Sequence, residues 1–192
     1  LAEGSATRII DASSAHRVAQ GWTYGFPELI GHEAIANARF VSNPGCYPTG
    51  FLALIAPLVR AGLLPADWPY TVNAVSGYSG GGNALIERFE NTPDIAFRAY
   101  GLQMGHKHLA EMQANAGLAH APVFSPSVIP AHRGMVVDVP LPLAALPGRP
   151  SPAALHAALE GYYSDSPFVA VAPLDPVPGE LLLLKSAAPR DG

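Results

Sequence analysis

The chain contains a single cysteine, Cys46, and the residues around it would allow its thiol to act as a nucleophile. It lies in a turn, 43–50, that leads into an apolar segment of helical character, 51–59. A helix N-terminus favours the reactive thiolate, because unpaired N–H groups and the helix dipole stabilise negative charge. Gly45 permits a tight turn, and Pro48 suits the first turn of a helix. The same N–H groups could hold the oxyanion of a tetrahedral intermediate. Free cysteines often fill the core instead, but the flanking proline and glycine residues favour the turn.

Two histidines, His106 and His108, could supply the acid–base partner that cysteine chemistry needs. If the segment 105–115 is a helix, Glu111 shares a face with His108 and could orient its ring. Lys107 adds a cation that could meet a phosphate or a carboxylate. The segment could also be an exposed polar helix start. A metal-ligand pair is disfavoured because the only cysteine is far away, and no metal is predicted.

A glycine-rich loop, 76–82, follows a strand at 70–76 and precedes a helix at 84–90. Such a loop can present backbone N–H groups to an anion, or it can be a simple flexible turn. It does not match the G-x-G-x-x-G fingerprint, and it lacks the lysine of a P-loop. The candidate contacts to a substrate or cofactor phosphate are Ser76, Gly77, Ser79 and Gly80.

The same loop supports a competing hypothesis, a serine hydrolase. Residues 77–81 fit G-x-S-x-G, the nucleophile elbow, with Ser79 as the nucleophile. Asp94 and the two histidines follow in the chain order that this class of enzyme uses. Three glycines after the serine weaken the helix start that should support the elbow, and the chain is short for that fold.

The elements that must position these residues are strand–helix units followed by longer strands with inserted helices. This order predicts an α/β region and then an α+β region. Ser14 and Arg17 come just after the first strand, at the edge where open α/β sheets bind ligands. The expected strands are 7–11, 39–42, 70–76, 123–128, 135–141, 168–172 and 179–185; the expected helices are 32–38, 51–59, 84–90, 105–115 and 151–163, and 22–29 is expected to be a loop.

Composition excludes several classes of protein. Hydrophobic residues make up 49% and charged residues 14%, which argues against disorder. The net charge is -4 with no run of lysine or arginine, so a nucleic acid or an anionic membrane has no basic surface to bind. No apolar run approaches the roughly 20 residues of a membrane span. A lone cysteine cannot form an internal disulfide, which favours a cytoplasmic location.

The turn sequence Ser-Asn-Pro-Gly-Cys-Tyr-Pro-Thr resembles the active-site signature of the N-acetyl-gamma-glutamyl-phosphate reductases of arginine biosynthesis, in their shorter bacterial form. Further segments match in the order of that family: 10–17, 24–29, 76–82, 106–111 and 133–135. The resemblance implies a partial Rossmann-type dinucleotide-binding domain and a C-terminal α+β catalytic domain like that of glyceraldehyde-3-phosphate dehydrogenase. It divides the chain into 1–49, 50–175 and a divergent tail, 176–192. It also implies truncation at both ends, because a Gly-rich fingerprint and a returning C-terminal segment are missing.

The resemblance further implies a reaction, NADPH-dependent reduction of N-acetyl-L-glutamyl 5-phosphate to the 5-semialdehyde with release of phosphate. Cys46 would carry the acyl group as a thioester, and the pair His106 and His108 would supply the acid–base group, with His108 favoured because Glu111 could reach it. NADP would be the cofactor, and the protein would be a homo-oligomer. Asn83 stands where a lysine or arginine often follows the loop in that family. The residues implied to bind substrate are Ser14, Arg17, Asn43, Lys107, Glu111 and Arg133. A related cysteine-dependent semialdehyde dehydrogenase with another acyl group remains the alternative.

Overall fold

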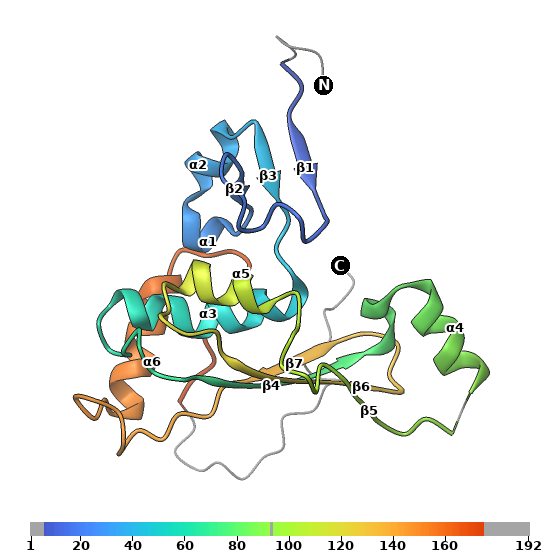
Figure 1. The fold of residues 1–192 in the computed structure, drawn as a ribbon. Coiled ribbons are helices and arrows are strands. Elements are labelled where there is room, and N and C mark those ends of the chain that lie inside the picture. Colours follow the sequence, from blue (N-terminus) through green and yellow to red (C-terminus); the bar gives the residue numbers. More distant parts are fainter. Residues whose placement is uncertain (1–5, 93, 175–192) are drawn as a thin grey trace.

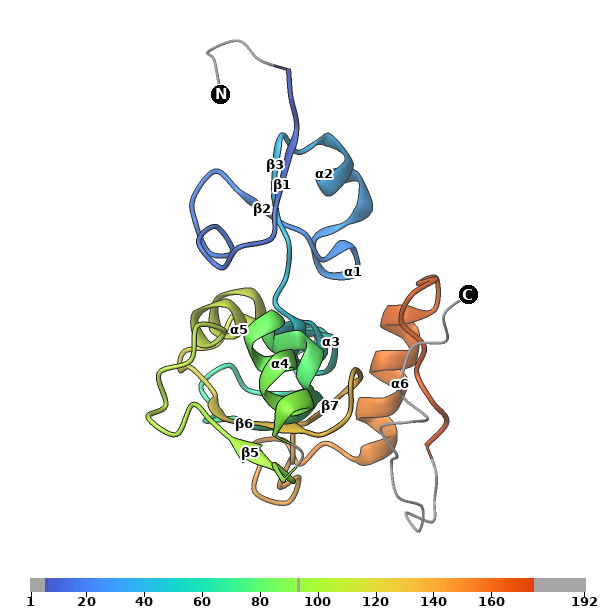
Figure 2. The same ribbon diagram turned by 90° about the vertical axis from the view of Figure 1, so that its right-hand side faces the viewer.

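The computed structural model describes residues 6–92 and 94–174, which form two units joined directly after β3 (Figures 1 and 2). The N-terminal unit is a small parallel sheet in the order β1-β3-β2, built from β1 (Ile9–Asp11), β3 (Phe40–Ser42) and β2 (Thr23–Tyr24). Two short helices, α1 (Pro27–Ile30) and α2 (His32–Asn37), accompany it. Because the strands are parallel, all their carboxyl ends lie at one edge, and β3 leads from that edge into the second unit.

The second unit is a four-stranded mixed sheet in the order β5-β6-β4-β7. Its central strands, β4 (Thr71–Gly77) and β6 (Val123–Ile129), are parallel; β7 (Met135–Asp138) and β5 (Arg98–Ala99) are antiparallel edges. Helices α3 (Cys46–Arg60) and α5 (Leu109–Ala116) lie over one face of the sheet, and α6 (Pro152–Tyr163) packs against α3. A 3-10 turn (Tyr78–Gly81) and α4 (Asn83–Asn91) follow β4. The predicted α/β class is confirmed.

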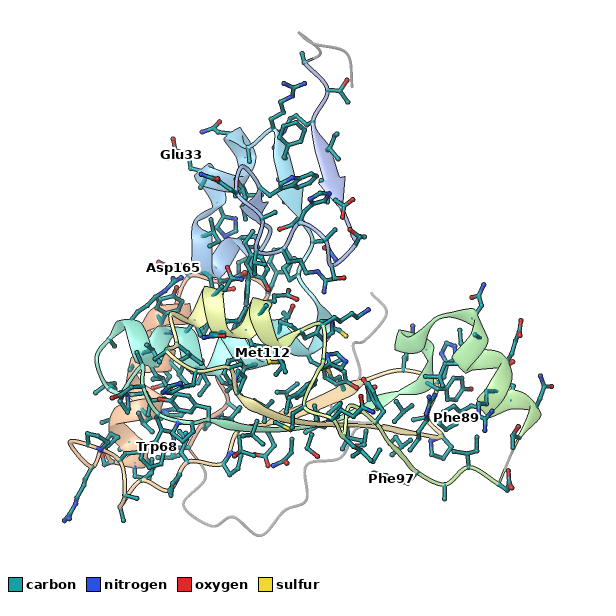
Figure 3. All side chains as sticks on the ribbon, viewed as in Figure 1. Glu33, Trp68, Phe89, Phe97, Met112 and Asp165 are labelled. Atoms are coloured by element: carbon teal, nitrogen blue, oxygen red, sulfur yellow. The ribbon has the colours of Figure 1, made fainter. Side chains whose placement is uncertain are left out.

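The main core lies between α3, α5 and the sheet. Phe51 and Leu52 of α3 are fully buried, as is Met112 of α5, which Figure 3 shows between the helices and the strands. Alternate residues of β4 face the same core, as the period of two in a strand requires. Gly50 allows the close approach of α3 to β7, because a Cβ there would lie 2.8 Å from a methyl group of Val137.

Helix α3 continues through Pro57, although a proline in a helix cannot donate a bond to the carbonyl four residues earlier. That carbonyl belongs to Ala53, and Tyr163 of α6 donates its hydroxyl proton to it at 2.8 Å. The side chain of a distant helix thus replaces the missing backbone donor. An interior carbonyl left without a donor costs about 1–3 kcal/mol, so this bond explains why the proline is tolerated.

The predicted elements agree with the structure in part. The helix expected at 51–59 begins five residues earlier, at Cys46, so the predicted boundary between residues 49 and 50 falls inside α3. The helix expected at 105–115 begins only at Leu109. The segment expected to be a loop at 22–29 contains β2 and α1, and β5 was not predicted at all.

The strand expected at 168–172 is absent, and that prediction is wrong. The backbone N–H groups of Phe168 and Val169 donate to the hydroxyl oxygen of Ser166 rather than to a neighbouring strand. Phe168 is also 82% exposed, so no described residue covers its side chain as a neighbouring layer would. The strand predicted at 179–185 lies outside the described residues. Within the described residues, no helix is long and apolar enough to cross a membrane.

Candidate active site

Cys46 is the first residue of α3, directly after the turn that leaves β3. It is exposed and borders a cleft of about 680 Å³ between the two units and the sheet. Thr49 closes the first turn by donating both its N–H and its hydroxyl to the carbonyl of Gly45, at 3.0 and 2.9 Å. The N–H groups of Cys46 and Tyr47 have no acceptor among the described residues. The thiol therefore sits at an open helix N-terminus, as the sequence predicted.

Most of the predicted site residues meet at this cleft. Those that line it are Arg17, Cys46, Ser76, Gly77, Ser79, Gly80, His106, Lys107 and His108. Four predicted residues do not line it, namely Ser14, Asn43, Glu111 and Arg133. Residues more than 90 positions apart in the sequence therefore converge on one site.

The two histidines stand in a turn before α5, edge to face, with ring centroids 4.6 Å apart. The Nδ1 atom of His106 accepts the backbone N–H of His108 at 3.2 Å. A neutral His106 ring therefore carries its proton on Nε2. His108 is buried, and its Nδ1 has no partner among the described residues. Its Nε2 lies against Gly45, 2.7 Å from where a Cβ on that glycine would be. One ring is thus packed against the cysteine turn, and the other supports it.

Both rings are held neutral. Burial lowers the pKa of His108 to about 3, and the positive charges of His106, Arg17 and Lys107 add to the effect. Burial also lowers the pKa of His106, and Lys107 contributes. At neutral pH the His108 ring is therefore uncharged, as a proton acceptor must be, and burial makes it a weak base.

The unfolding free energy of the chain is expected to fall as the pH is lowered from 7 toward 4. An unfolded histidine titrates near 6.5, whereas folded His108 titrates near 3. Between these values only the unfolded state binds the proton, so this contribution is fully present above pH 6.5 and is lost below it. The loss is at most about 1.4 kcal/mol per pH unit for this ring. Denaturant titrations at pH 7, 6 and 5 give the unfolding free energy at each pH. This free energy should depend less steeply on pH in His108→Gln than in the wild type. Equal slopes would show that the native ring titrates normally.

Glu111 makes no hydrogen bond to His108, contrary to what the sequence analysis expected, although atoms of both residues lie beside Gly45. Its carboxylate is buried and accepts three other hydrogen bonds: from the hydroxyl of Tyr24 at 2.7 Å, the N–H of Gly45 at 2.6 Å and the guanidinium of Arg17 at 3.1 Å. Burial and the Glu111 charge both raise the pKa of Tyr24, so that residue stays a donor. Glu111 therefore ties the N-terminal unit, the cysteine turn and α5 together, and it is placed away from the substrate side of the cleft.

Arg17 is also largely used by the fold. Besides Glu111, its guanidinium donates to the carbonyls of Asn43 at 2.9 Å and Ala12 at 3.2 Å. Only 9% of its side chain is exposed. Ser14 is exposed in the loop after β1, outside the cleft lining. Arg133 is exposed on the connection to β7, where its backbone packs against Gly77.

The glycine-rich loop offers fewer anion-binding groups than the sequence analysis expected. The N–H groups of Gly77, Tyr78 and Ser79 all donate to carbonyls of the 131–134 segment, at 2.9 Å each. Gly80 has open space around its Cα. A ligand could therefore approach the loop backbone at Gly80 rather than at residues 77–79. Ser79 makes no side-chain hydrogen bond to another described residue, and in particular none to a histidine. The nucleophile–base contact of a serine hydrolase is thus missing from the described residues.

Sequence reasoning missed three polar side chains that border the cleft: Tyr47, Arg98 and Tyr100. The Tyr100 hydroxyl donates to that of Tyr47 at 3.1 Å, and Tyr47 shares a 2.8 Å bond with Ser76. Burial raises the pKa of both tyrosines, which keeps them protonated. Tyr47 could have been found because it follows the cysteine directly. Arg98 lies on a strand of two residues, too short to leave a pattern, and Tyr100 follows that strand directly.

Comparison with protein families gives a match over most of the chain. Residues 46–184 match the family model described as the dimerisation domain of semialdehyde dehydrogenases. The chain is 51% identical over 183 residues to N-acetyl-gamma-glutamyl-phosphate reductase 2 of Nostoc, covering 90% of this chain and 57% of the relative. It is 52% identical to the N-acetyl-gamma-glutamyl-phosphate reductase of Brucella ovis, covering 91% of this chain and 59% of that relative. The chain thus spans less than two thirds of the length of these relatives.

Solved structures show the same fold. Aspartate semialdehyde dehydrogenase II from Vibrio cholerae superposes with a TM-score of 0.54 and 19% identity, covering 79% of this chain and 52% of the other. A second structure of that protein, described as complexed with ASA, superposes with a TM-score of 0.51 and 17% identity. The superposition covers 68% of this chain and 46% of the other. At such identity the likeness concerns the fold alone, and it agrees with the predicted mixed α/β class.

Proposed function

The chain belongs to the semialdehyde dehydrogenase family, and from this membership we propose that it forms the catalytic part of an N-acetyl-gamma-glutamyl-phosphate reductase. The whole protein would reduce N-acetyl-L-glutamyl 5-phosphate to N-acetyl-L-glutamate 5-semialdehyde and release phosphate, in the cytoplasm. One observation carries the proposal: the only thiol stands at an open helix N-terminus, on a cleft that neutral histidines also line. The choice of N-acetylglutamyl as the acyl group rests on the names of the relatives that are about 50% identical to the chain.

In the first step His108 takes the proton of the Cys46 thiol, and the sulfur attacks the acyl carbon. The carbon–sulfur bond forms, the bond to the phosphate oxygen breaks, and phosphate leaves with the proton that His108 had taken up. The free N–H groups of Cys46 and Tyr47 stabilise the oxyanion of the tetrahedral intermediate. The Nε2–H of His106 is a further donor at the same cleft. The product of this step is a thioester on Cys46.

Reduction of the thioester needs a hydride, which a reduced nicotinamide, NADPH in this proposal, supplies when bound. The residues present fit the reactive end of such a cofactor. The cleft opens beside Cys46 at the carboxyl ends of parallel strands, where dinucleotides bind in α/β sheets. Gly80 offers backbone without a side chain next to the cleft. The protein then holds the alkoxide with its N–H donors while the carbon–sulfur bond breaks, which frees the aldehyde and returns the thiolate.

Trapping of the thioester tests this function. The whole protein, incubated with N-acetylglutamyl phosphate but without NADPH, should gain one N-acetylglutamyl group on the peptide that contains Cys46, detected by mass spectrometry. Aspartyl phosphate should label it much more slowly. Labelling of Ser79 would support the hydrolase, and faster labelling by aspartyl phosphate would support a different semialdehyde dehydrogenase. No labelling at all would refute the proposal.

We also propose that two copies of the protein associate through the face of the sheet opposite α3 and α5. Among the described residues, no helix covers that face (Figures 1 and 2). Asn73 of β4 is exposed, and it pairs in register with Asp138 of β7, which is exposed as well. The matching family model is that of a dimerisation domain.

Introduction of a charge into this face should separate the copies. Asn73→Arg would place a long charged side chain in the contact, so light scattering after gel filtration should give half the wild-type mass. Glu33→Arg, on the exposed surface of α2, is the matched control and should leave the mass unchanged. A monomeric wild type, or an Asn73→Arg protein of unchanged mass, would contradict this association.

A further inference from the structure

The cleft beside Cys46 is lined by cations and by no carboxylate. Its charged lining residues, within the described parts of the chain, are Arg17, Arg98 and Lys107. The protein as a whole has a net charge of -4, so this local excess of positive charge is not a reflection of composition. A cleft with one sign of charge attracts ligands of the opposite sign. The geometry therefore favours a substrate with at least one anionic group besides the reacting one.

The three cations differ in their availability. Arg17 already bonds Glu111 and two backbone carbonyls, and its side chain is 9% exposed. Arg98 and Lys107 are exposed, and the side chain of neither makes a hydrogen bond or an ion pair with another described residue. Arg98 differs from Lys107 in carrying a planar fork of N–H donors, which matches the two oxygens of a carboxylate. Lys107 acts only as a point charge.

Arg98 lines the same cleft as Cys46, at the end of a row of side chains that leads back to the cysteine turn. It precedes by two residues Tyr100, whose hydroxyl reaches Tyr47 beside Cys46. Tyr100 continues the pairing of β5 with β6 through its N–H, so the two residues share a strand face and stand about 7 Å apart. Both line the cleft. In an extended N-acetylglutamyl thioester the free carboxylate lies about 5 Å from the carbonyl carbon on sulfur.

We propose that Arg98 is the specificity-determining residue that binds the carboxylate at the far end of the acyl group. The inference rests on the proposed function, since it needs an acyl group held on Cys46. Arg98 would fix the distance between the carboxylate and the carbonyl under attack. It would thereby select the length of the acyl chain, because a shorter acyl group could not reach both Arg98 and the sulfur. Binding energy at this remote group would orient the carbonyl for reaction.

Kinetics of the whole protein with two substrates test the inference. One is N-acetylglutamyl phosphate; the other is 4-acetamidobutyryl phosphate, which has the same chain without the carboxylate. For Arg98→Gln, kcat/KM with the first substrate should fall about 100-fold, because a charged hydrogen-bonded pair is lost. With the second substrate it should change less than about threefold. Arg98→Lys should recover only part of the loss, because a single ammonium lacks the fork.

The controls separate recognition from damage to the fold. Arg88→Gln removes an exposed cation of α4 outside the cleft lining and should match wild type with both substrates. An equal loss of activity on both substrates by Arg98→Gln, or a raised KM for NADPH instead, would overturn the role of Arg98. A wild-type protein that reduces neither acyl phosphate would refute the proposed function itself. An active wild-type protein together with an Arg98→Gln variant of unchanged kcat/KM would refute only the role of Arg98 and leave the proposed function standing.

Discussion

Replacement of Cys46 by serine should lower kcat/KM for the acyl phosphate by about 10⁴-fold or more in the whole protein. A serine hydroxyl at this position is far less ionised than a thiol, and the two histidines beside it are neutral and weakly basic because they are buried. Loss of a nucleophile in an enzyme with a covalent intermediate commonly costs this much or more. Steady-state reduction of N-acetylglutamyl phosphate, followed by the oxidation of NADPH, measures the effect.

Ser79→Ala is the matched control, because Ser79 borders the same cleft and is the nucleophile of the competing hydrolase hypothesis. Its effect on the reduction should stay within about tenfold, since its side chain makes no hydrogen bond to another described residue. A hydrolase would show the reverse order, with Ser79→Ala inactive and Cys46→Ser nearly unchanged. That result would contradict the thioester mechanism.

Truncation of Glu111 to alanine should destabilise the chain by about 3–5 kcal/mol. The change leaves the guanidinium of Arg17 without its only ion-pair partner among the described residues, and that side chain is nearly buried. Removing one partner of a buried pair costs this much because the remaining charge stays desolvated. The hydroxyl of Tyr24 and the N–H of Gly45 lose their acceptor as well. Chemical denaturation at pH 7 measures the loss.

Glu111→Gln keeps the shape and one acceptor oxygen, so it should cost less than the alanine variant and still fold. Because Glu111→Ala removes the acceptor that holds the N–H of Gly45, that variant should slow alkylation of Cys46 by iodoacetamide severalfold under conditions where it is folded. A residue with a purely structural role would leave that rate unchanged in the folded protein. Glu33→Gln is the control; this glutamate is exposed (Figure 3), and its loss should stay within about 0.5 kcal/mol. Equal stability of the two glutamine variants would contradict the bridging role.

The cysteine turn could be predicted from the sequence because its signals are local. Glycine before the thiol and proline in the first turn determine where a helix can begin, whatever the rest of the chain does. The apolar segment that follows shows that the helix is buried. The strand–helix order likewise followed from short-range periodicity, so the α/β class was within reach.

The partners of the buried polar groups could not be predicted in this way. Glu111 accepts hydrogen bonds from Arg17, Tyr24 and Gly45, which precede it in the sequence by 94, 87 and 66 positions. Helical spacing had instead pointed to His108 as its partner. Spacing reports which residues share a face only after the helix begins, and α5 begins after His108. Arg98 escaped notice for a related reason: its strand has two residues and exists through pairing with β6.

The bond between Tyr163 and the Ala53 carbonyl has a consequence for the order of events during synthesis. Tyr163 leaves the ribosome 110 residues after Ala53, which at about 5–20 residues per second is a delay of roughly 5 to 20 s. During that interval the proline-containing turn of α3 has a carbonyl that no backbone donor can serve. The helix that presents the nucleophile is therefore expected to reach its final rigidity only once nearly the whole catalytic unit has been translated.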